Sequence, residues 1–407
     1  MTKSAEVVVI GAGLAGLTAA RGLVKAGLSV ELIEASAEIG GRIRTENFDG
    51  FQLDHGFQLF NPAYPAARKV LNINELELRK FSKGIRILLD NEIIQFGTNP
   101  SESLNFIKSF NRTGLINLAR YLLLTLFSGE EKRKSRADLP AYEILQNICN
   151  DDQIINQILI PFLSGVFLEK NLNVSRHWLD EVLRYFVLGS PGIPRYGMQQ
   201  IPMQLSRGVT EFISLNTKVE SIDTGVVNTS TGIRAPKYIV LAADPVSIAS
   251  LLGLPMPKMN SVITWYFTIS HRYRGSRTKL LAIDGSSNPG PLINSAVLTD
   301  VAKSYAPRGQ DLVCGSALSD DFEVIDKVKN HIALMHTLNP AHLNFLKSFR
   351  IDNALPETGY LRKLDLTNFK AKNIYISSDL ISTPSINGAV SAGQEAADQI
   401  VLKELRS

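Results

Sequence analysis

Three glycines near the N-terminus have the spacing of a turn that binds a dinucleotide. They follow an apolar, β-branched run at residues 6–10 in the order G-x-G-x-x-G. The first glycine permits a tight turn, the second lets backbone approach a pyrophosphate, and the third lets the next helix pack closely on the strand. The helix N-terminus then offers N–H groups to the phosphates. The predicted contacts are Gly11, Gly13, Leu14, Ala15 and Gly16.

A carboxylate follows at the place where a ribose is expected. Residues 14–26 read as a helix that Gly27 ends, and residues 29–33 read as a second strand. Glu34 closes this strand, 23 residues after Gly11, and Ala35 lies next to it. An acid at this position accepts hydrogen bonds from the adenosine ribose and disfavours a 2′-phosphate. Because all the parts occur in order, a nucleotide site is favoured over a chance glycine turn.

A second glycine motif narrows the nucleotide to FAD. Gly40-Gly41-Arg42 resembles the Gly-Gly-Arg segment of the superfamily of flavin-containing amine oxidases, phytoene desaturases and protoporphyrinogen oxidases. Arginine is a fork-shaped donor that can neutralise a pyrophosphate. The resemblance implies FAD as the cofactor, with Gly41 and Arg42 in contact with it.

The C-terminal part resembles the closing segment of the same superfamily. Residues 373–377 read as a strand, and small residues at 384–393 open a helix that runs through Ile400. The resemblance implies that Asp379 meets the ribityl–phosphate region and that the start of the helix approaches the isoalloxazine. The family usually has Gly-Asp where this chain has Ser378-Asp379. The implied contacts are Asp379, Asn387, Gly388 and Ala389.

Two matches in the middle of the chain complete the resemblance. Residues 51–57 resemble a stretch that passes the flavin ring, and residues 197–205 resemble one that crosses under it. The strand that follows would place a backbone group against the adenine. Neither cysteine nor a suitable histidine stands in the closing segment, so FAD is expected to bind without a covalent link. The contacts implied here are Asp54, His55, Gly56 and Val219.

These motifs predict an α/β fold in which a discontinuous Rossmann-type FAD-binding domain carries a mixed α+β substrate domain. The FAD-binding domain would take residues 1–68, 201–244 and 355–407, and the substrate domain residues 69–200 and 245–354. In the latter, alternation predicts a hairpin at 84–96, and helical periodicity dominates 103–187. Further strands are expected at 261–269, 279–283, 293–299 and 312–318, and a helix at 321–335.

Composition sets wider bounds on the protein. Its 407 residues are 44% hydrophobic, and 43 basic against 39 acidic residues leave a net charge of +4. Two distant cysteines and the lack of a signal peptide favour a reducing, cytoplasmic location. The densest basic stretch, residues 271–279, reads as a solvated loop, so no nucleic-acid partner is expected.

Two other kinds of site are disfavoured. His331, His336 and His342 are five and six residues apart, which puts no pair on one helical face, so no metal site is expected. The apolar residues 115–127, followed by the basic residues 132–134, could form an interfacial helix on a membrane. A core helix with a solvated loop is the favoured alternative, because Glu130 and Glu131 offset the basic charge.

The favoured function is removal of a hydride from a C–H bond of a largely apolar small molecule, as in desaturases. No acid or base is assigned; His55, Tyr196 and Trp178 are candidates only because polar and aromatic groups line such pockets. An amine oxidase is less favoured, since no aromatic pair is evident around residues 383–386. Further alternatives are a non-redox flavin mutase and a prenyl-binding escort module that does not use FAD.

Overall fold

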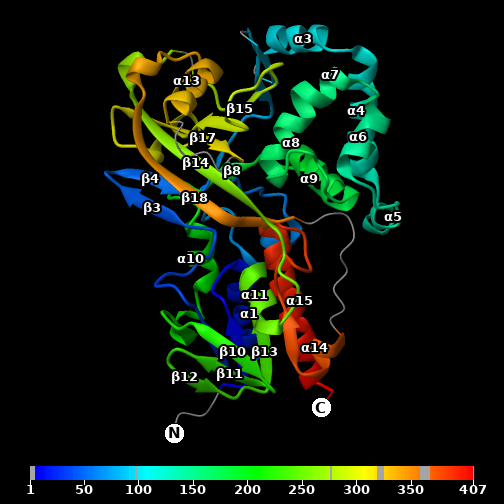
Figure 1. Ribbon diagram of the computed structural model, residues 1–407, viewed down its shortest axis with the longest axis vertical. Coiled ribbons are helices and arrows are strands. Elements are labelled where there is room, and N and C mark those ends of the chain that lie inside the picture. The colour runs from blue at the N-terminus through cyan, green and yellow to red at the C-terminus, as the bar shows by residue number, and fades with distance from the viewer. Residues whose placement is uncertain are drawn as a thin grey trace.

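The computed structural model of the protein describes residues 5–90, 92–97, 99–275, 277–318, 325–357 and 367–406. It has an α/β fold with two lobes (Figure 1). The lower lobe is built on a five-stranded parallel sheet, and the upper lobe on a seven-stranded mixed sheet. Helices flank both sheets.

The parallel sheet brings together segments that are far apart in the sequence. Its strands, in spatial order, are β19 (Ile374–Ile376), β13 (Tyr238–Leu241), β1 (Val7–Ile10), β2 (Val30–Ile33) and β9 (Ile213–Ser214). Continuous apolar runs such as Val7–Ile10 suit strands that are buried on both faces. Val7 and Val9 pack on one side with the first and last helices, whereas Val8 and Ile10 pack on the other side with β11 and α11.

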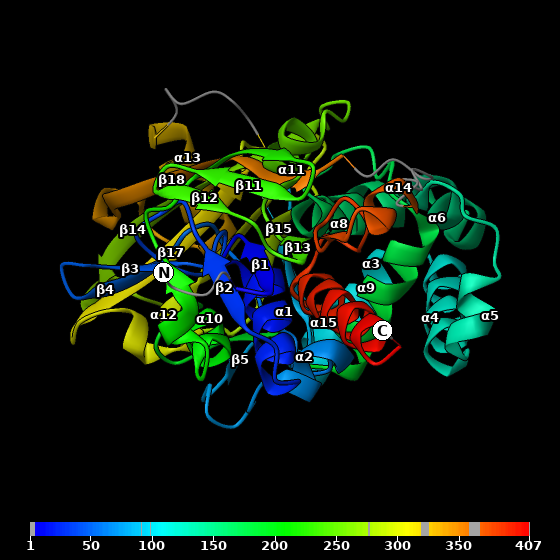
Figure 2. The ribbon, with the colours of Figure 1, turned by 90° about the horizontal axis from the view of Figure 1, so that it is seen from below.

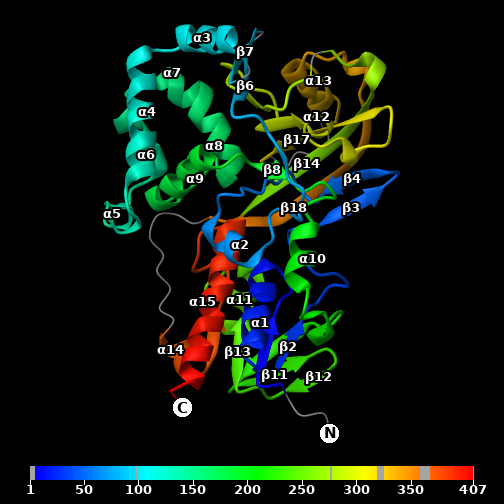
Figure 3. The same ribbon diagram turned by 180° about the vertical axis from the view of Figure 1, so that it is seen from behind.

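Helices cover one face of this sheet, and a small meander with a helix covers the other (Figures 1 and 3). The first layer holds α1 (Leu14–Lys25), α15 (Ile386–Glu404), α2 (Pro65–Val70) and α10 (Gln200–Ser206). The second holds β10 (Val219–Asp223), β11 (Val226–Thr229), β12 (Gly232–Arg234) and α11 (Pro245–Leu252).

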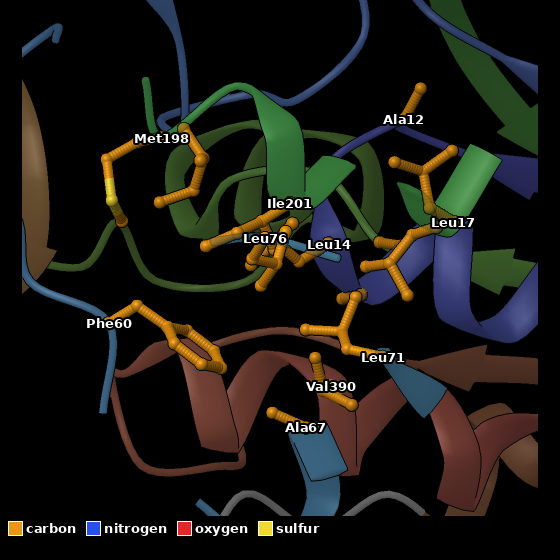
Figure 4. Close-up of a cluster of buried hydrophobic side chains, with 14 of the residues drawn as sticks. Ala12, Leu14, Leu17, Phe60, Ala67, Leu71, Leu76, Met198, Ile201 and Val390 are labelled. Carbon is orange, nitrogen blue, oxygen red and sulfur yellow. The ribbon is translucent and has the colours of Figure 1, made fainter. Parts of the chain in front are cut away.

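Close packing of α1 on the glycine turn and on α15 depends on small residues. A Cβ atom on Gly16 would lie 1.8 Å from the Gly11 carbonyl oxygen, and one on Gly393 would lie 2.3 Å from the Ala15 oxygen. Both positions therefore require glycine if the packing is to be kept. Figure 4 shows the neighbouring core, where side chains of α1, the end of α2 and α15, among them Leu17, Leu71 and Val390, meet in one cluster.

The seven-stranded sheet forms the centre of the upper lobe. In spatial order it holds β18 (Asn344–Pro356), β14 (Met259–Ser270), β17 (Gln310–Ala317), β16 (Asn294–Val297), β15 (Leu281–Asp284), β6 (Ile85–Leu89) and β7 (Glu92–Phe96). Trp265 and Phe267 of β14 pack against α13 (Ile325–His336). Ile87 and Ile283 pack against the helical group on the other side.

That helical group lies at the outer edge of the upper lobe (Figure 1). It consists of α3 (Pro100–Ser109), α4 (Arg112–Phe127), α5 (Glu130–Lys134), α6 (Ala141–Cys149), α7 (Asp152–Ile154), a π-helical turn η1 (Ile155–Leu159), α8 (Ile160–Phe167) and α9 (Arg176–Leu188). Asn99 and Asn111 cap α3 and α4 by accepting a hydrogen bond from a backbone N–H of the first turn.

The other elements of the described ranges are short. They are β3 (Thr45–Phe48), β4 (Phe51–Asp54), β5 (Arg79–Lys80), β8 (Gly192–Ile193), α12 (Leu298–Val301), α14 (Thr367–Ala371) and the 3₁₀ turns η2 (Thr210–Phe212), η3 (His271–Tyr273), η4 (Lys303–Tyr305) and η5 (Pro340–His342). Among the helices of the described ranges, none is both long and apolar enough to cross a bilayer.

Most expected elements are confirmed, with small shifts at their ends. The hairpin at 84–96 is the antiparallel pair β6–β7. The strand expected at 293–299 ends at Val297, where the chain turns into α12. The first four residues of the helix expected at 321–335 lie outside the described residues, and α13 then runs from Ile325. The domain limits stay a prediction, and the one at 354/355 falls inside β18.

Candidate functional site

A cavity of about 700 Å³ lies where the parallel sheet meets the upper lobe. One end is lined by the turns that follow β1, β2, β13 and β19, which lie at the carboxyl ends of parallel strands. In open parallel sheets ligands bind at that edge. The other end is walled by α8 and α9, and Figure 2 shows α9 beside α15, whose Asn387 donates a hydrogen bond to Glu181 of α9.

The glycine turn forms part of the cavity wall. Gly11 has a φ of 102°, and its N–H donates to the Ile33 carbonyl oxygen at 2.7 Å, which fixes the turn across the ends of β1 and β2. Gly13 differs, because a Cβ atom built there would meet no protein atom within 4 Å. The protein leaves open space above this backbone, as the approach of a pyrophosphate requires.

Glu34 is held rigidly beside this turn. Its Oε2 accepts a hydrogen bond from the Ala12 N–H at 2.8 Å, and its Oε1 accepts from the backbone N–H and the hydroxyl of Ser36 at 2.9 and 2.8 Å. Arg44 donates to the same hydroxyl at 3.0 Å. The carboxylate therefore keeps one orientation. Ala35 and Val219 line the cavity next to it.

The Gly-Gly-Arg motif meets the C-terminal motif at the middle of the cavity. The Arg42 guanidinium donates to the carboxylate of Asp379 and to the Ala354 carbonyl oxygen. The Asp379 side chain is 4% exposed, whereas that of Arg42 is 34% exposed and borders the cavity together with Gly41. Two motifs that are more than three hundred residues apart thus form one charged contact.

Some of the residues predicted to contact the cofactor stand behind the cavity wall. Asp54 is buried and accepts hydrogen bonds from the Thr45 hydroxyl, the Met198 N–H and the Tyr305 hydroxyl. Burial raises the pKa of Asp54 to about 6, although these three donors lower it. Its carboxylate therefore ties the wall together, while Gly56, two residues on, lines the cavity itself.

His55 and Tyr196 do not line the cavity either. The His55 ring stacks on Phe349 with 4.4 Å between the ring centroids, and burial followed by the charge of Arg44 lowers its pKa. Tyr196 is 51% exposed and lies under the guanidinium of Arg195. Among the three candidate catalytic residues, Trp178 is the one that lines the cavity.

Side-chain hydrogen bonds fix the start of α15 beside the cavity. The Ser385 hydroxyl accepts a hydrogen bond from the Gly388 N–H at 2.9 Å and caps the helix. Asn387 is buried; its Oδ1 accepts from the Ala66 N–H at 3.0 Å, and its Nδ2 donates away from the helix. Ala389 lines the cavity, while Gly16, Asn387 and Gly388 support it from behind.

The acceptor for Asn387 is an acidic residue that sequence reasoning missed. Glu181 lines the cavity and accepts a hydrogen bond from the Asn387 amide at 3.1 Å and another from the Thr383 hydroxyl at 3.0 Å. Burial raises its pKa, and the two donors lower it. The spacing of Trp178, Glu181 and Tyr185 on one helical face was the signal that could have found it.

Aromatic side chains surround this acid. Tyr64 and Tyr185 lie edge to face with their ring centroids 5.3 Å apart, and burial raises the pKa of both hydroxyls, to about 12 for Tyr185. Apart from the polar residues Asn61, Asn294 and Ser316, most of this end of the cavity is aromatic or aliphatic. It is formed by Phe162, Val166, Leu168, Trp178, Val182 and Phe186.

Comparison with known proteins agrees with this arrangement. The family model described as flavin containing amine oxidoreductase matches residues 14–401. The chain belongs to this family. The family is flavin-containing, and the residues present fit FAD. The space above Gly13 gives room for the pyrophosphate, the Glu34 carboxylate is an acceptor, and the Arg42 guanidinium is a donor.

Individual relatives of this member of the family are distant. The L-amino-acid oxidase of Naja atra is 22% identical over 274 residues, which are 60% of this chain and 51% of that protein. Protoporphyrinogen oxidase 2 of Arabidopsis thaliana is 26% identical over 168 residues, which are 39% and 32% of the two chains. The chain thus spans about half or less of the length of these relatives.

A solved structure shares the fold across nearly the whole chain. Reduced UDP-galactopyranose mutase superposes with a TM-score of 0.71 at 13% identity, covering 98% of this chain and 96% of the mutase. At this identity the likeness shows the fold alone. It confirms the α/β fold expected from the sequence, and it leaves the reaction to be argued from the site.

Proposed function

We propose that the protein is an FAD-dependent oxidoreductase that dehydrogenates a largely apolar small molecule. The observation that carries the proposal is the shape of the single cavity described above, which has a nucleotide end and an apolar end. The turn at Gly13 and the Glu34 carboxylate form the first, and the aromatic wall of α8 and α9 forms the second. A substrate in the apolar end would lie directly against the bound cofactor.

The residues of the nucleotide end would hold FAD. Backbone around Gly13 would face the pyrophosphate, Glu34 the ribose, and Arg42 would supply positive charge. When bound, FAD supplies the acceptor for two electrons, and the protein supplies position and exclusion of water. Positioning alone can lower the reaction barrier substantially if the reacting carbon of the substrate is held about 3–3.5 Å from the atom that accepts the hydride.

Glu181 is the ionisable carboxylate at the apolar end of the cavity. We propose that it is the base that accepts the proton lost by the substrate. Dehydrogenation removes a hydride and a proton from the substrate, so a nearby base assists the second loss. Hydrogen bonds from Thr383 and Asn387 orient both Glu181 oxygens, and its raised pKa makes it able to hold a proton once taken. His55, a catalytic candidate in the stretch that resembles one passing the flavin ring, lies outside the cavity lining.

The alternatives differ in what they require of the cavity. An amine substrate would pair its cation with Glu181 beside the Tyr64 and Tyr185 rings, which keeps an amine oxidase as the second candidate. A sugar-nucleotide mutase would need arginines at the substrate end. Among the residues that line the described cavity, the arginine is Arg42, and it lies at the middle beside Asp379.

A substrate screen tests the proposal. The protein, saturated with FAD, is mixed anaerobically with isoprenoids, amines and UDP-sugars, and loss of the flavin absorbance is followed. Bleaching by isoprenoids and not by small amines is the expected result. Bleaching by small amines alone would establish the amine oxidase instead. A protein that retains no FAD would contradict the proposal as a whole and favour an escort module.

A further inference from the structure

Helix α4 exposes large apolar side chains along one face. Ile116, Leu123, Leu124 and Phe127 are 52, 53, 63 and 81% exposed, and we call these four residues the α4 face. Their spacing of seven, one and three residues puts them on the same side of a helix. Helix α4 lies on the outer edge of the upper lobe, where α4 and α5 form the margin of the molecule (Figures 1 and 2).

The opposite side of α4 accounts for the packing of the helix. Gly114, Tyr121 and Thr125 are buried there, and Leu118 and Leu122 pack partly against the helical core. The interpretation of α4 as a core helix, which the sequence favoured, therefore accounts for the buried side of the helix only. It leaves the larger apolar residues in water, where each exposed Leu or Phe forgoes the benefit of burial.

Basic residues lie within and next to the α4 face: Arg120, four residues after Ile116, is on the same side of α4, and Lys132 and Lys134 follow in α5. Residues 100–134, from α3 to α5, hold six Lys or Arg and three Glu, so they carry +3 of the chain's net charge of +4. Lys132, Lys134 and Arg120 are exposed, and the Glu130 carboxylate is already paired with Lys134 at 2.6 Å. An apolar helical face with a positive rim is complementary to an anionic membrane surface.

We propose that the α4 face docks the protein on an anionic phospholipid bilayer. Helix α4 would lie in the plane of the interface, with Leu124 and Phe127 among the acyl chains and Arg120 and Lys132 at the headgroups. A second copy of the chain fits this surface less well, because a symmetric contact would bring two positive rims together. A bilayer would bury the apolar residues among its acyl chains and pair the basic residues with its anionic headgroups.

Helix α4 lies close to the apolar end of the cavity. Helix α9 lies between α4 and the cavity: its Arg184 donates to the Thr125 carbonyl oxygen of α4 at 3.4 Å, and its Asp180 accepts from the Tyr121 hydroxyl. Val182 and Tyr185 of the same helix line the cavity. One helix thus separates the docking surface from the apolar end. Resting on the proposed function, this points to a substrate that is dissolved in the membrane.

Vesicle sedimentation tests the docking without any turnover. The FAD-saturated protein is mixed with sucrose-loaded vesicles of phosphatidylcholine, with and without phosphatidylglycerol, and the bound fraction is measured after centrifugation. Binding to the anionic vesicles that falls as salt rises is expected. The double variant Leu124→Ser/Phe127→Ser should lower the partition coefficient at least about tenfold. Ile233→Ser is the matched control, because Ile233 is 70% exposed on β12 in the lower lobe.

The outcomes separate this inference from the proposed function. Wild-type protein that stays in the supernatant, or a double variant that sediments as the wild type does, would overturn the docking whatever the substrate screen gives. Self-association that Leu124→Ser/Phe127→Ser abolishes, without vesicle binding, would assign the α4 face to a second copy and also overturn it. Vesicle binding combined with loss of FAD retention would leave the docking standing and remove the proposed function.

Discussion

At the scale of single residues, the nucleotide end of the cavity depends on Glu34. Its carboxylate should hold the ribose, so Glu34→Ala should weaken FAD binding by about 1–3 kcal/mol through lost charged hydrogen bonds. Glu31→Ala is the control, since Glu31 lies on β2, the strand that Glu34 follows, but pairs with Arg234 at 2.9 Å. FAD titration followed by flavin fluorescence gives the affinity. Equal affinities in the two variants would mean that the ribose is held elsewhere.

A substitution at Gly13 tests whether the pyrophosphate of FAD lies against this part of the backbone. Because a Cβ there meets no protein atom within 4 Å, Gly13→Val should fold, yet its side chain would occupy the space that the phosphates need. We expect colourless protein with an unchanged circular dichroism spectrum. Gly129→Val, at another glycine with open space around it, should stay yellow. A yellow Gly13→Val protein would place the cofactor differently.

Glu181 should govern the pH dependence of flavin reduction. Burial raises its pKa, so the carboxylate becomes the proton acceptor only as pH rises through that raised value, and the rate should rise with it. Glu181→Gln should flatten this profile and slow anaerobic flavin reduction by about 10²–10⁴-fold. His55→Ala should change the rate only modestly, since His55 stacks on Phe349. The reverse pattern would assign the proton to His55.

At the scale of elements, Asp54 joins four parts of the chain. It ends β4 and binds Thr45 of β3, the Met198 N–H before α10 and Tyr305 of η4. Its pKa is about 6 in the folded protein against an ordinary 3.8, so the folded state holds the proton more tightly than the unfolded state. Stability therefore falls as pH rises from about 4 to 6 and is level above that.

Asp54→Asn removes this titration while keeping an acceptor for Thr45 and Met198. Relative to the wild type, the variant should gain stability as pH rises, by at most about 3 kcal/mol between pH 4 and 6, since one pKa unit is worth 1.36 kcal/mol. Urea unfolding at a series of pH values measures the difference. Two curves that stay parallel over this range would show that Asp54 titrates normally in the folded chain.

Local elements were predictable because their signals are local. The first strand, the glycine turn, the helix at 14–25 and Glu34 lie within some thirty residues, and each follows from its own sequence. The substrate end has no such signal. Glu181 belongs to the cavity because α9 meets Thr383 and Asn387, about two hundred residues later in the chain. Spacing on α9 marks a face, but it does not say that the face borders a cavity.

The same reasoning explains the residues that lie behind the wall. Asp54 and His55 stand in a stretch that resembles the family, and alternation along β4 places neighbouring side chains on opposite sides. Resemblance identified the stretch, whereas the side that faces the cavity depends on the partners of each residue. Tyr305 and Phe349, which come from distant elements, decide it.

At the scale of the whole molecule, the cofactor should be held by folding alone. Within the described chain, Cys149 and Cys314 are buried and free, and neither lines the cavity. Acid precipitation should therefore release all of the yellow colour into the supernatant, because unfolding removes every contact with FAD. The absorbance of pellet and supernatant is the measurement, and colour retained in the pellet would indicate a covalent link.

The order of segments in the parallel sheet has a consequence for biosynthesis. The glycine turn emerges from the ribosome more than three hundred residues before β19, Asp379 and α15, which complete the sheet and meet Arg42. A nascent chain therefore presents half of a dinucleotide site for most of its synthesis. We therefore expect the complete dinucleotide site to form, and flavin to load, only after β19, Asp379 and α15 have been synthesised.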